Sequence, residues 1–537
     1  MPVIEVDQKD LAGLCKIPEG ELEAVLQMVK ASVDEKVGKW KLEITGDRPD
    51  LLSTEGVARA VLGFIGKETG LAEYKVEKSK YELKVGKVSA RPYILGAVIE
   101  GVKLTDQLIK SIVQMQEKLH EGVGRKRMKV ALGINDLDKI KFPVNYTEKT
   151  EEFKFTPLGL TKDITLKDIL EKTAQGKAYG KLLEGFKKYP ILMDSAGKVI
   201  SMPPIVMSER VKIGAGTKNI FVDVTGTDLK AVSLVLNLVV SAIAERGGKI
   251  KSVTVGGKQY PNFSTETIKV SVGDIDKTLG LGLKEKEVVS ILERMRYGAK
   301  ALKGGVIEVS IPAYRGDILH WIDIAEDVAI GYGYNNIQPF IPRIGTVGKI
   351  LEKTKMNRKA REVMAGLGFQ EILTFVLTSN KNQFQRMELK GEGIKIENPI
   401  SSEFETARAW LLPGMLKILE PNKHRDYPQK IFEIGDCVLK GGEETGYKNV
   451  RKIAAVVTHD TANLTEIKSF LEAFCKLMGK KIEIRPVEHK SFIDSRAAEV
   501  FSEGKSIGIF GEIHPSLLQN FGLEKPAIAF ELDLNVI

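Results

Sequence analysis

Four carboxylates, Asp317, Asp323, Glu326 and Asp327, lie within eleven residues of one another and could do chemistry. On a helix, Asp323, Glu326 and Asp327 stand at i, i+3 and i+4, so we expect them on one face. Like charges at this spacing repel by roughly 0.2–0.5 kcal/mol per pair. A hard cation such as Mg²⁺ or Ca²⁺, which takes oxygen ligands, would offset that repulsion. Acidic residues also collect in the first turns of helices because the macrodipole favours them there, so both interpretations stay open.

The elements around these carboxylates are predicted to run strand, helix, strand, helix. A strand at 268–272 precedes a helix at 283–296, and a strand at 306–311 precedes the acidic helix. On that helix we expect the apolar residues Ile322, Ala325 and Ala329 to face the core. This arrangement would turn the three carboxylates outward, toward solvent or a partner.

The composition is that of a soluble globular protein with several cores. The chain has 537 residues, of which 43% are hydrophobic and 28% are charged, and this length suggests three to five domains. It carries 80 basic and 71 acidic residues, giving a net charge of +9. This modest excess is compatible with a polyanion such as nucleic acid but does not demand one.

Cysteine, histidine and apolar patterns exclude several classes. Cys15, Cys437 and Cys475 are far apart with no C-x-x-C, which favours a reducing cytoplasm over a disulfide framework or zinc knuckle. The six histidines form no H-E-x-x-H motif. The longest apolar run, 231–244, is too short to span a bilayer, so we expect no membrane association. Two glycine patterns, at 331–336 and 504–506, lack the residues of nucleotide-binding loops and are interpreted as turns.

We predict an α+β multidomain fold with four blocks. Residues 1–85 read as an α/β domain, and 86–260 as a second α/β domain of alternating strands and helices. The small α+β block at 263–340 carries the acidic helix. Residues 345–537 read as an antiparallel sheet with helices, including strands at 370–377, 430–438, 452–458 and 527–533. None of these blocks carries a self-contained catalytic signature.

Six segments, met in order along nearly the whole chain, together resemble the β subunit of phenylalanyl-tRNA synthetase in its archaeal/eukaryotic form. They are 42–59 (LEITGDRPDLLSTEGVAR, similar to N-R-P-D-L-L-S-x-E-G with Asp47 for asparagine); 133–138 (GINDLD); 189–194 with 201–205 and 221–228 (YPILMD, SMPPI, FVDVTGTD); 311–334; 398–403 with 411–414 and 431–435 (NPISSE, LLPG, IFEIG); and 508–515 (GIFGEIHP).

The resemblance implies an (αβ)₂ phenylalanine–tRNA ligase that joins L-Phe to tRNA(Phe) with ATP, the active site lying on a separate α subunit. Residues 345–537 would be similar to a class II synthetase core that has lost its catalytic motifs. The segments 431–435 and 529–533 agree, because neither contains the arginine that clamps ATP phosphates in that class. Asp317, Asp323, Glu326 and Asp327 match the family's Mg²⁺ positions, which implies a structural or interface ion.

The resemblance also implies that 86–260 hydrolyses misacylated Tyr-tRNA, since a phenylalanine pocket rejects tyrosine imperfectly. Asp223 matches the residue that reads the phenol, and Leu192, Ser201 and Thr225 match other residues of that pocket. Candidates for contacting the tRNA terminus are Lys118, Arg125 and Arg127. A turn-capping role for Asp223 and a solvated face for the basic residues are the plain alternatives.

Two positions depart from the family's pattern in this block. Met207 stands where asparagine is expected, and Asn135 replaces an aromatic residue or histidine. Losing an amide removes two donors and an acceptor, so we expect editing to be altered.

Two other functions compete with this interpretation. A free-standing tRNA-binding or trans-editing protein is disfavoured because a free editor needs no inactive class II-like core. An independent Mg²⁺-dependent phosphotransferase is disfavoured because no phosphate-cradling loop accompanies the carboxylates.

Overall fold

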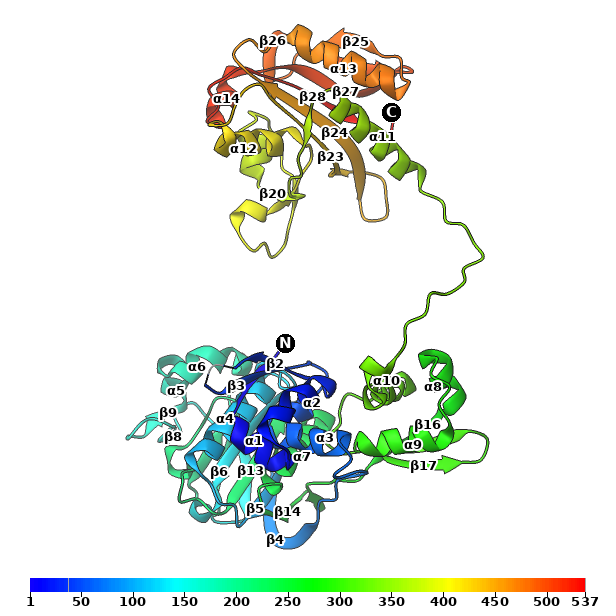
Figure 1. The fold of residues 1–537 in the computed structure, drawn as a ribbon. Helices are drawn as coiled ribbons and strands as arrows, with labels where there is room; N and C mark the ends of the chain where they lie inside the picture. The colour runs from blue at the N-terminus through cyan, green and yellow to red at the C-terminus, as the bar shows by residue number, and fades with distance from the viewer. Residues whose placement is uncertain (37, 537) are drawn as a thin grey trace. The chain divides into compact units, whose positions relative to one another are not determined.

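The computed structural model describes residues 1–36 and 38–536. It divides into two units, Met1–Ile341 and Pro342–Ile537, which are coloured blue to green and green to red in Figure 1. The first unit begins with a three-stranded sheet in the order β1 (Val3–Val6), β3 (Trp40–Ile44), β2 (Ala31–Glu35). Its helices are α1 (Gln8–Cys15), α2 (Leu22–Met28) and α3 (Thr54–Phe64).

The buried helix α3 starts at a cap built from the DRPDLLS run. The hydroxyl of Ser53 accepts a hydrogen bond from the backbone N–H of Gly56 at 3.0 Å. A Cβ at Gly56 would lie 1.8 Å from the carbonyl oxygen of Asp50, so only glycine permits this close approach.

A mixed ten-stranded sheet forms the centre of the first unit. Its order is β12-β11-β10-β7-β4-β14-β5-β13-β6, with β15 paired to β14. The strands are β4 (Val76–Val85), β5 (Tyr93–Glu100), β6 (Val130–Asp136), β7 (Val144–Lys149), β10 (Tyr189–Met193), β11 (Val199–Met202), β12 (Val206–Met207), β13 (Ile220–Gly226), β14 (Lys249–Val255) and β15 (Lys258–Tyr260). Because β4 pairs in parallel with β7 and β14, this sheet begins before residue 86.

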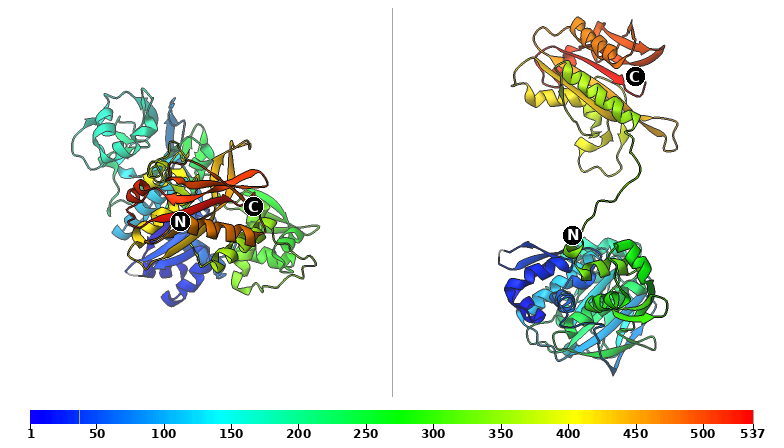
Figure 2. Two further views of the ribbon diagram at one scale, coloured as in Figure 1. Left: turned by 90° about the horizontal axis from the view of Figure 1, so that it is seen from above. Right: turned by 45° about the vertical axis from the view of Figure 1, so that its right-hand side comes forward.

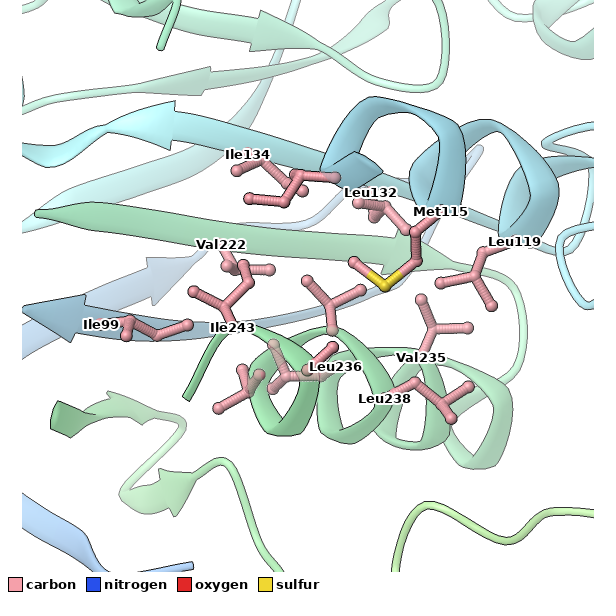
Figure 3. Close-up of a cluster of buried hydrophobic side chains, with 14 of the residues drawn as sticks. Ile99, Met115, Leu119, Leu132, Ile134, Val222, Val235, Leu236, Leu238 and Ile243 are labelled. Carbon is pink, nitrogen blue, oxygen red and sulfur yellow. The ribbon is translucent and has the colours of Figure 1, made fainter. Parts of the chain in front are cut away.

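Two amphipathic helices, α4 (Asp106–Glu121) and α7 (Leu229–Ala244), lie against one side of this sheet. Side chains such as Met115 of α4, Leu236 of α7 and Val222 of β13 point toward one another in the core, as Figure 3 shows. Residues of the N-terminal sheet join the same hydrophobic cluster, so this core is continuous from Ile4 to Val255.

A smaller lobe with its own apolar cluster projects beside strands β10–β12, and Figure 2 (left, cyan) shows it standing apart. It contains β8 (Lys154–Phe155), β9 (Ile164–Thr165), α5 (Leu166–Lys172) and α6 (Ala174–Tyr179). A third sheet, β16 (Glu266–Ser271), β18 (Val306–Ile311), β17 (Gly298–Leu302), packs with α8 (Val272–Leu279), α9 (Glu285–Arg294) and α10 (Trp321–Tyr332). The acidic segment enters α10.

The second unit is a seven-stranded sheet between helices (Figures 1 and 2). The order is β19 (Gln370–Glu371), β23 (Gln429–Lys440), β24 (Tyr447–Thr458), β28 (Ala527–Asp533), β27 (Lys505–Ile513), β26 (Phe492–Ser502), β25 (Glu483–Pro486). All pairs are antiparallel except β19–β23. Helices α11 (Glu352–Gly366) and α13 (Leu464–Met478) share one core with the sheet, and α12 (Leu412–Asn422) and α14 (Pro515–Asn520) share another.

The single strand predicted at 370–377 is wrong. The chain leaves the large sheet after Glu371 and pairs again only at β20 (Leu377–Thr378), in a small sheet with β22 (Thr406–Ala407) and β21 (Ile394–Lys395). The physical reason is Glu433, whose carboxylate accepts hydrogen bonds from the backbone N–H and the hydroxyl of Thr374 between the two segments.

No helix in the described residues has both the length and the apolar character needed to cross a membrane.

Candidate functional site

A cavity of about 240 Å³ lies beside the C-terminal half of α4, between β6, β13 and the β11–β12 connection. Apolar side chains form much of its wall, among them Val113, Leu158, Met202, Ile205 and Met207. Its polar groups include Glu117, His120, Ser201, Asp223 and Thr225. An apolar cavity with a few convergent polar groups is the usual form of a small-ligand site.

Asp223 is the buried charge of this cavity. Its side chain is only 2% exposed and accepts a hydrogen bond from Nδ2 of Asn135 at 2.7 Å. Burial raises the pKa of Asp223 to about 6, and the Asn135 hydrogen bond opposes that rise. Gly133 stands opposite on β6, where a Cβ would lie 2.6 Å from Oδ1 of Asp223. The carboxylate therefore fits only because Gly133 has no side chain.

The other three predicted pocket residues take different places. Ser201 lines the cavity, and its buried hydroxyl has no hydrogen-bond partner among the described residues. Thr225 also lines the cavity, but Nε of Arg91 donates to its hydroxyl at 3.2 Å. Leu192 lies on β10, where it is fully buried and pairs with Ser201 of β11. It is not among the residues that line the cavity.

A hydrogen-bonded group on α4 forms the opposite side. The backbone N–H of Leu132 donates to Nε2 of His120 at 2.9 Å, so Nε2 is unprotonated and Nδ1 carries the hydrogen. Nδ1 then donates to Glu117 at 3.3 Å. Burial lowers the pKa of His120, against the effect of Glu117, so His120 is neutral at physiological pH. Sequence reasoning missed this pair, because pairing of α4 with β6 has no local signal.

Of the three predicted tRNA-contact residues, Arg127 is used within the protein. Its guanidinium donates to Glu117 at 3.0 Å and to the carbonyl of Ile205 at 3.1 Å, and it lies over the ring of Tyr179. Arg127 therefore joins α4, the β11–β12 connection and α6 rather than reaching outward.

The other two basic residues remain accessible. Lys118 lines a different cavity, near the N-terminus, and Arg125 is exposed. Arg125, Lys126 and Arg127 have φ of 48°, 54° and 67°, a strained left-handed run that costs on the order of 1–3 kcal/mol per residue. Exposed Lys126, which the sequence did not single out, lies beside Arg125.

The acidic segment does not gather its four carboxylates around one point. Asp327 is 1% exposed and accepts hydrogen bonds from the Tyr297 hydroxyl and from Arg315 at 2.7 Å. Arg315 also donates to Asp317, at 2.6 and 2.8 Å. Although burial raises the pKa of Asp327, Arg315 and Arg48 outweigh it and hold that pKa below its usual value. Asp317 and Asp327 thus share one buried arginine.

The remaining two carboxylates have other partners. Asp323 accepts the backbone N–H groups of Leu319 and His320, both at 2.8 Å, and so caps α10. Glu326 is exposed and pairs with Lys30 at 2.9 Å.

The expected outward acidic face is therefore wrong for Asp327, which turns inward to Arg315 and Tyr297. Ala325 and Ala329 are buried as expected, but Ile322 is 43% exposed. Across the described residues no group of three or more His, Cys, Asp or Glu side chains could hold a metal ion. As arranged in this chain alone, the four carboxylates do not fit one Mg²⁺ ion.

Comparisons with known proteins give the family. The phenylalanyl tRNA synthetase beta chain CLM domain matches residues 337–534, and the tRNA synthetase B5 domain matches residues 268–334. Phenylalanine–tRNA ligase beta subunits of Archaeoglobus fulgidus and Methanocaldococcus jannaschii are 38% and 41% identical to the chain. The first alignment covers 100% of this chain and 98% of the relative, the second 99% and 100%.

The chain belongs to the phenylalanine–tRNA ligase β-subunit family. It is thus part of a ligase enzyme. A solved structure agrees: an N-terminal fragment of the β subunit from Pyrococcus horikoshii is 40% identical with a TM-score of 0.60, and the alignment covers 62% of this chain and 100% of that one. The mixed α/β fold with several sheets is that of the family's N-terminal part.

Two of the segments that carried the β-subunit resemblance meet in the first unit. Arg48 and Asp50 of the DRPDLLS run form a buried bidentate pair, with both distances 2.8 Å. They line one small buried space together with Arg315 of the acidic segment. The charges of these two segments therefore form one buried network, which fixes the N-terminal sheet against the third sheet.

In the second unit, the β-subunit sheet carries two buried glutamates on one face. Glu433 on β23 and Glu531 on β28 flank Ala454 of β24 in the same register row. Arg408 pairs with Glu433 at 2.6 Å, and Lys452 pairs with Glu531 at 2.8 Å. Both cations are thus neutralised by carboxylates of the same chain.

Proposed function

We propose that this chain is the noncatalytic β subunit of an (αβ)₂ phenylalanine–tRNA ligase, with aminoacylation on the α subunit. The observation that carries the proposal is the buried pairing on the second unit's sheet. A class II site clamps ATP phosphates with arginines. Here Arg408 and Lys452 are taken by Glu433 and Glu531, so that face offers paired charge instead of a phosphate clamp. The chain would act as a scaffold for the α subunit.

An exposed apolar surface supports docking to that α subunit. Leu373, Phe375 and Ile400 of the second unit are 81%, 79% and 98% exposed. Phe375 packs edge-on against Phe404, with ring centroids 5.9 Å apart. Exposed apolar residues gathered in one region mark a protein contact.

We propose further that the 240 Å³ cavity edits tyrosine from misacylated tRNA(Phe). The hydroxyl of a bound tyrosyl group would donate to the carboxylate of Asp223, whereas phenylalanine would leave that buried charge without a partner. Leaving a buried polar group unpaired discriminates strongly, by as much as about 10⁴-fold. Arg125 and Lys126 would meet phosphates of the tRNA terminus near the cavity.

The two departures from the family's pattern change the cavity wall. Met207 lines it with a thioether where an amide would supply donors and an acceptor. Asn135 supplies the hydrogen bond to Asp223. Recognition of the substrate would then depend on Asp223 and Ser201, and less on residue 207.

Mg²⁺ binding through Asp317, Asp323, Glu326 and Asp327 stays a prediction from the resemblance. Arg315 donates to both oxygens of Asp317 and to Oδ2 of Asp327, so it would compete with an ion for them.

The buried, unpaired cysteines Cys15, Cys437 and Cys475 support the proposed cytoplasmic location, because thiols stay reduced there.

Co-expression with an α subunit tests the main proposal. The chain alone should form no Phe-tRNA, and the co-purified complex should form it in an ATP-dependent reaction. A chain that edits without any α subunit would instead indicate the free-standing editor. ATP hydrolysis by the isolated chain would indicate the phosphotransferase.

A further inference from the structure

The amide of Asn135 has a single possible orientation. Its Nδ2 donates both to Oδ1 of Asp223 at 2.7 Å and to the carbonyl oxygen of Phe221 at 3.2 Å. A flipped amide would place Oδ1 of Asn135 against two acceptors, so the hydrogen-bond network fixes the assignment. Asn135 is fully buried on β6, and its own Oδ1 has no partner in the described part of the chain. The amide is thus committed to donating.

No cation offsets the charge of Asp223 among the described residues. The titratable groups packed around it are Tyr146 of β7; Arg91, which donates to Thr225; and, across the cavity, Glu117, His120 and Arg127. Of the last three, Glu117 accepts hydrogen bonds from both His120 and Arg127. Asn135 is therefore the one side chain described as donating to the carboxylate of Asp223, and a buried carboxylate is stabilised by such a donor.

We propose that Asn135 is a positioning residue of the editing reaction: it holds Asp223 as a carboxylate, with Oδ1 occupied and Oδ2 free to accept the hydroxyl of a tyrosyl group. Oδ2 of Asp223 accepts no hydrogen bond from the described residues, and the residue lines the cavity. The inference rests on the proposed editing function. It makes tyrosine recognition depend on the protonation state of one buried carboxyl.

The sign of that dependence follows from the donor. Above its pKa of about 6, Asp223 is ionised and accepts from the phenol; below it, the carboxyl is neutral and carries a proton of its own. Removing the donor disfavours the carboxylate and moves the midpoint to higher pH. Placing a second carboxyl at residue 135 gives a pair that shares one proton, so the pair titrates in two steps, the second of them at higher pH than the wild-type midpoint.

Two nearly isosteric variants of the co-expressed αβ enzyme test the inference. Hydrolysis of preformed Tyr-tRNA is measured from pH 5 to 8.5 for wild type, Asn135→Leu and Asn135→Asp, with the uncatalysed rate subtracted. We expect a higher midpoint for Asn135→Leu than for wild type, and two titration steps for Asn135→Asp. A shift of about two pH units for Asn135→Leu would slow hydrolysis roughly tenfold at pH 7 and restore it toward pH 8.5.

The outcomes separate the inference from the editing function itself. If wild type hydrolyses Tyr-tRNA but both variants keep its midpoint, or lose rate equally at every pH, Asn135 is not a positioning residue. If wild type hydrolyses Tyr-tRNA no faster than Asp223→Ala, the editing proposal fails, and this inference falls with it. Unchanged Phe-tRNA formation by each variant shows that the complex has assembled.

Discussion

The guanidinium of Arg315 lies 2.7 Å from Oδ2 of Asp327, and both side chains are almost completely buried. Because of this pair, the acidic segment is part of a buried ion-pair network. The sequence predicts a cation site at these carboxylates, but Arg315 of the same chain already pairs with two of them. The pair holds α10 to the segment that carries Arg315, within reach of the charge of Arg48 in the DRPDLLS run.

Removing the Arg315 guanidinium should therefore lower the free energy of unfolding. Arg315→Met leaves Asp317 and Asp327 buried without the guanidinium that donates to both, and breaking a buried pair costs about 3–5 kcal/mol. Lys172→Met, which removes the exposed i,i+4 pair with Asp168, is the matched control and should cost less than about 0.5 kcal/mol. Urea unfolding of the chain measures both, and equal losses would contradict the account.

The carboxylates of the acidic segment should show no Mg²⁺ dependence in the isolated chain, because each is already partnered. In scanning calorimetry, millimolar Mg²⁺ should leave the Tm of the wild-type chain unchanged, and it should likewise leave the Tm of Asp323→Asn unchanged. A Tm that Mg²⁺ raises in the chain but not in Asp323→Asn and Asp327→Asn would instead support the predicted ion site.

The buried carboxyl of Asp223 should lower the stability of the folded protein once it is ionised. Its pKa is about 6 in the folded protein and about 3.9 when unfolded, so the unfolded state loses the proton first as pH rises. The free energy of unfolding therefore falls by on the order of 3 kcal/mol as pH rises from about 4 to 6. Because Asn does not titrate, Asp223→Asn should gain that amount relative to wild type between pH 4 and 7. A pH-independent difference in the free energy of unfolding would refute this.

The two arginines near the cavity should behave differently toward tRNA. Arg125 is exposed, so Arg125→Met should reduce the slope of log K against log salt by about 0.7–1 without loss of stability. Arg127 makes its hydrogen bonds within the chain, so Arg127→Met should leave the slope unchanged and lower stability by about 1–3 kcal/mol. Equal slope changes for the two variants would show that Arg127 also contacts phosphate.

The local elements were accessible from the sequence, and the contacts between distant elements were not. Periodicity placed the strand at 306–311 and the helix at 283–296 to within two residues, because burial of one face leaves a repeating pattern. The family resemblance indicated Ser201, Asp223 and Thr225, and all three line one cavity.

What the sequence could not supply was the pairing of β6 with β13, which joins residues almost ninety positions apart and places Asn135 and Gly133 beside Asp223. The prediction that Asp327 faces outward was wrong for a related reason. The spacing of the carboxylates in the acidic segment indicates repulsion, but it does not show that Arg315, two positions from Asp317, offsets their charge. Tyr297, the other partner of Asp327, comes from a turn thirty residues away.

The measurement that tests the account most directly is the decay of preformed Tyr-tRNA on the assembled αβ enzyme at pH 7.5, compared between wild type and Asp223→Ala. We predict that wild type hydrolyses Tyr-tRNA much faster than Phe-tRNA, and that Asp223→Ala loses this preference while forming Phe-tRNA at the wild-type rate. Equal decay of Tyr-tRNA on the two enzymes would show that the cavity is not an editing site.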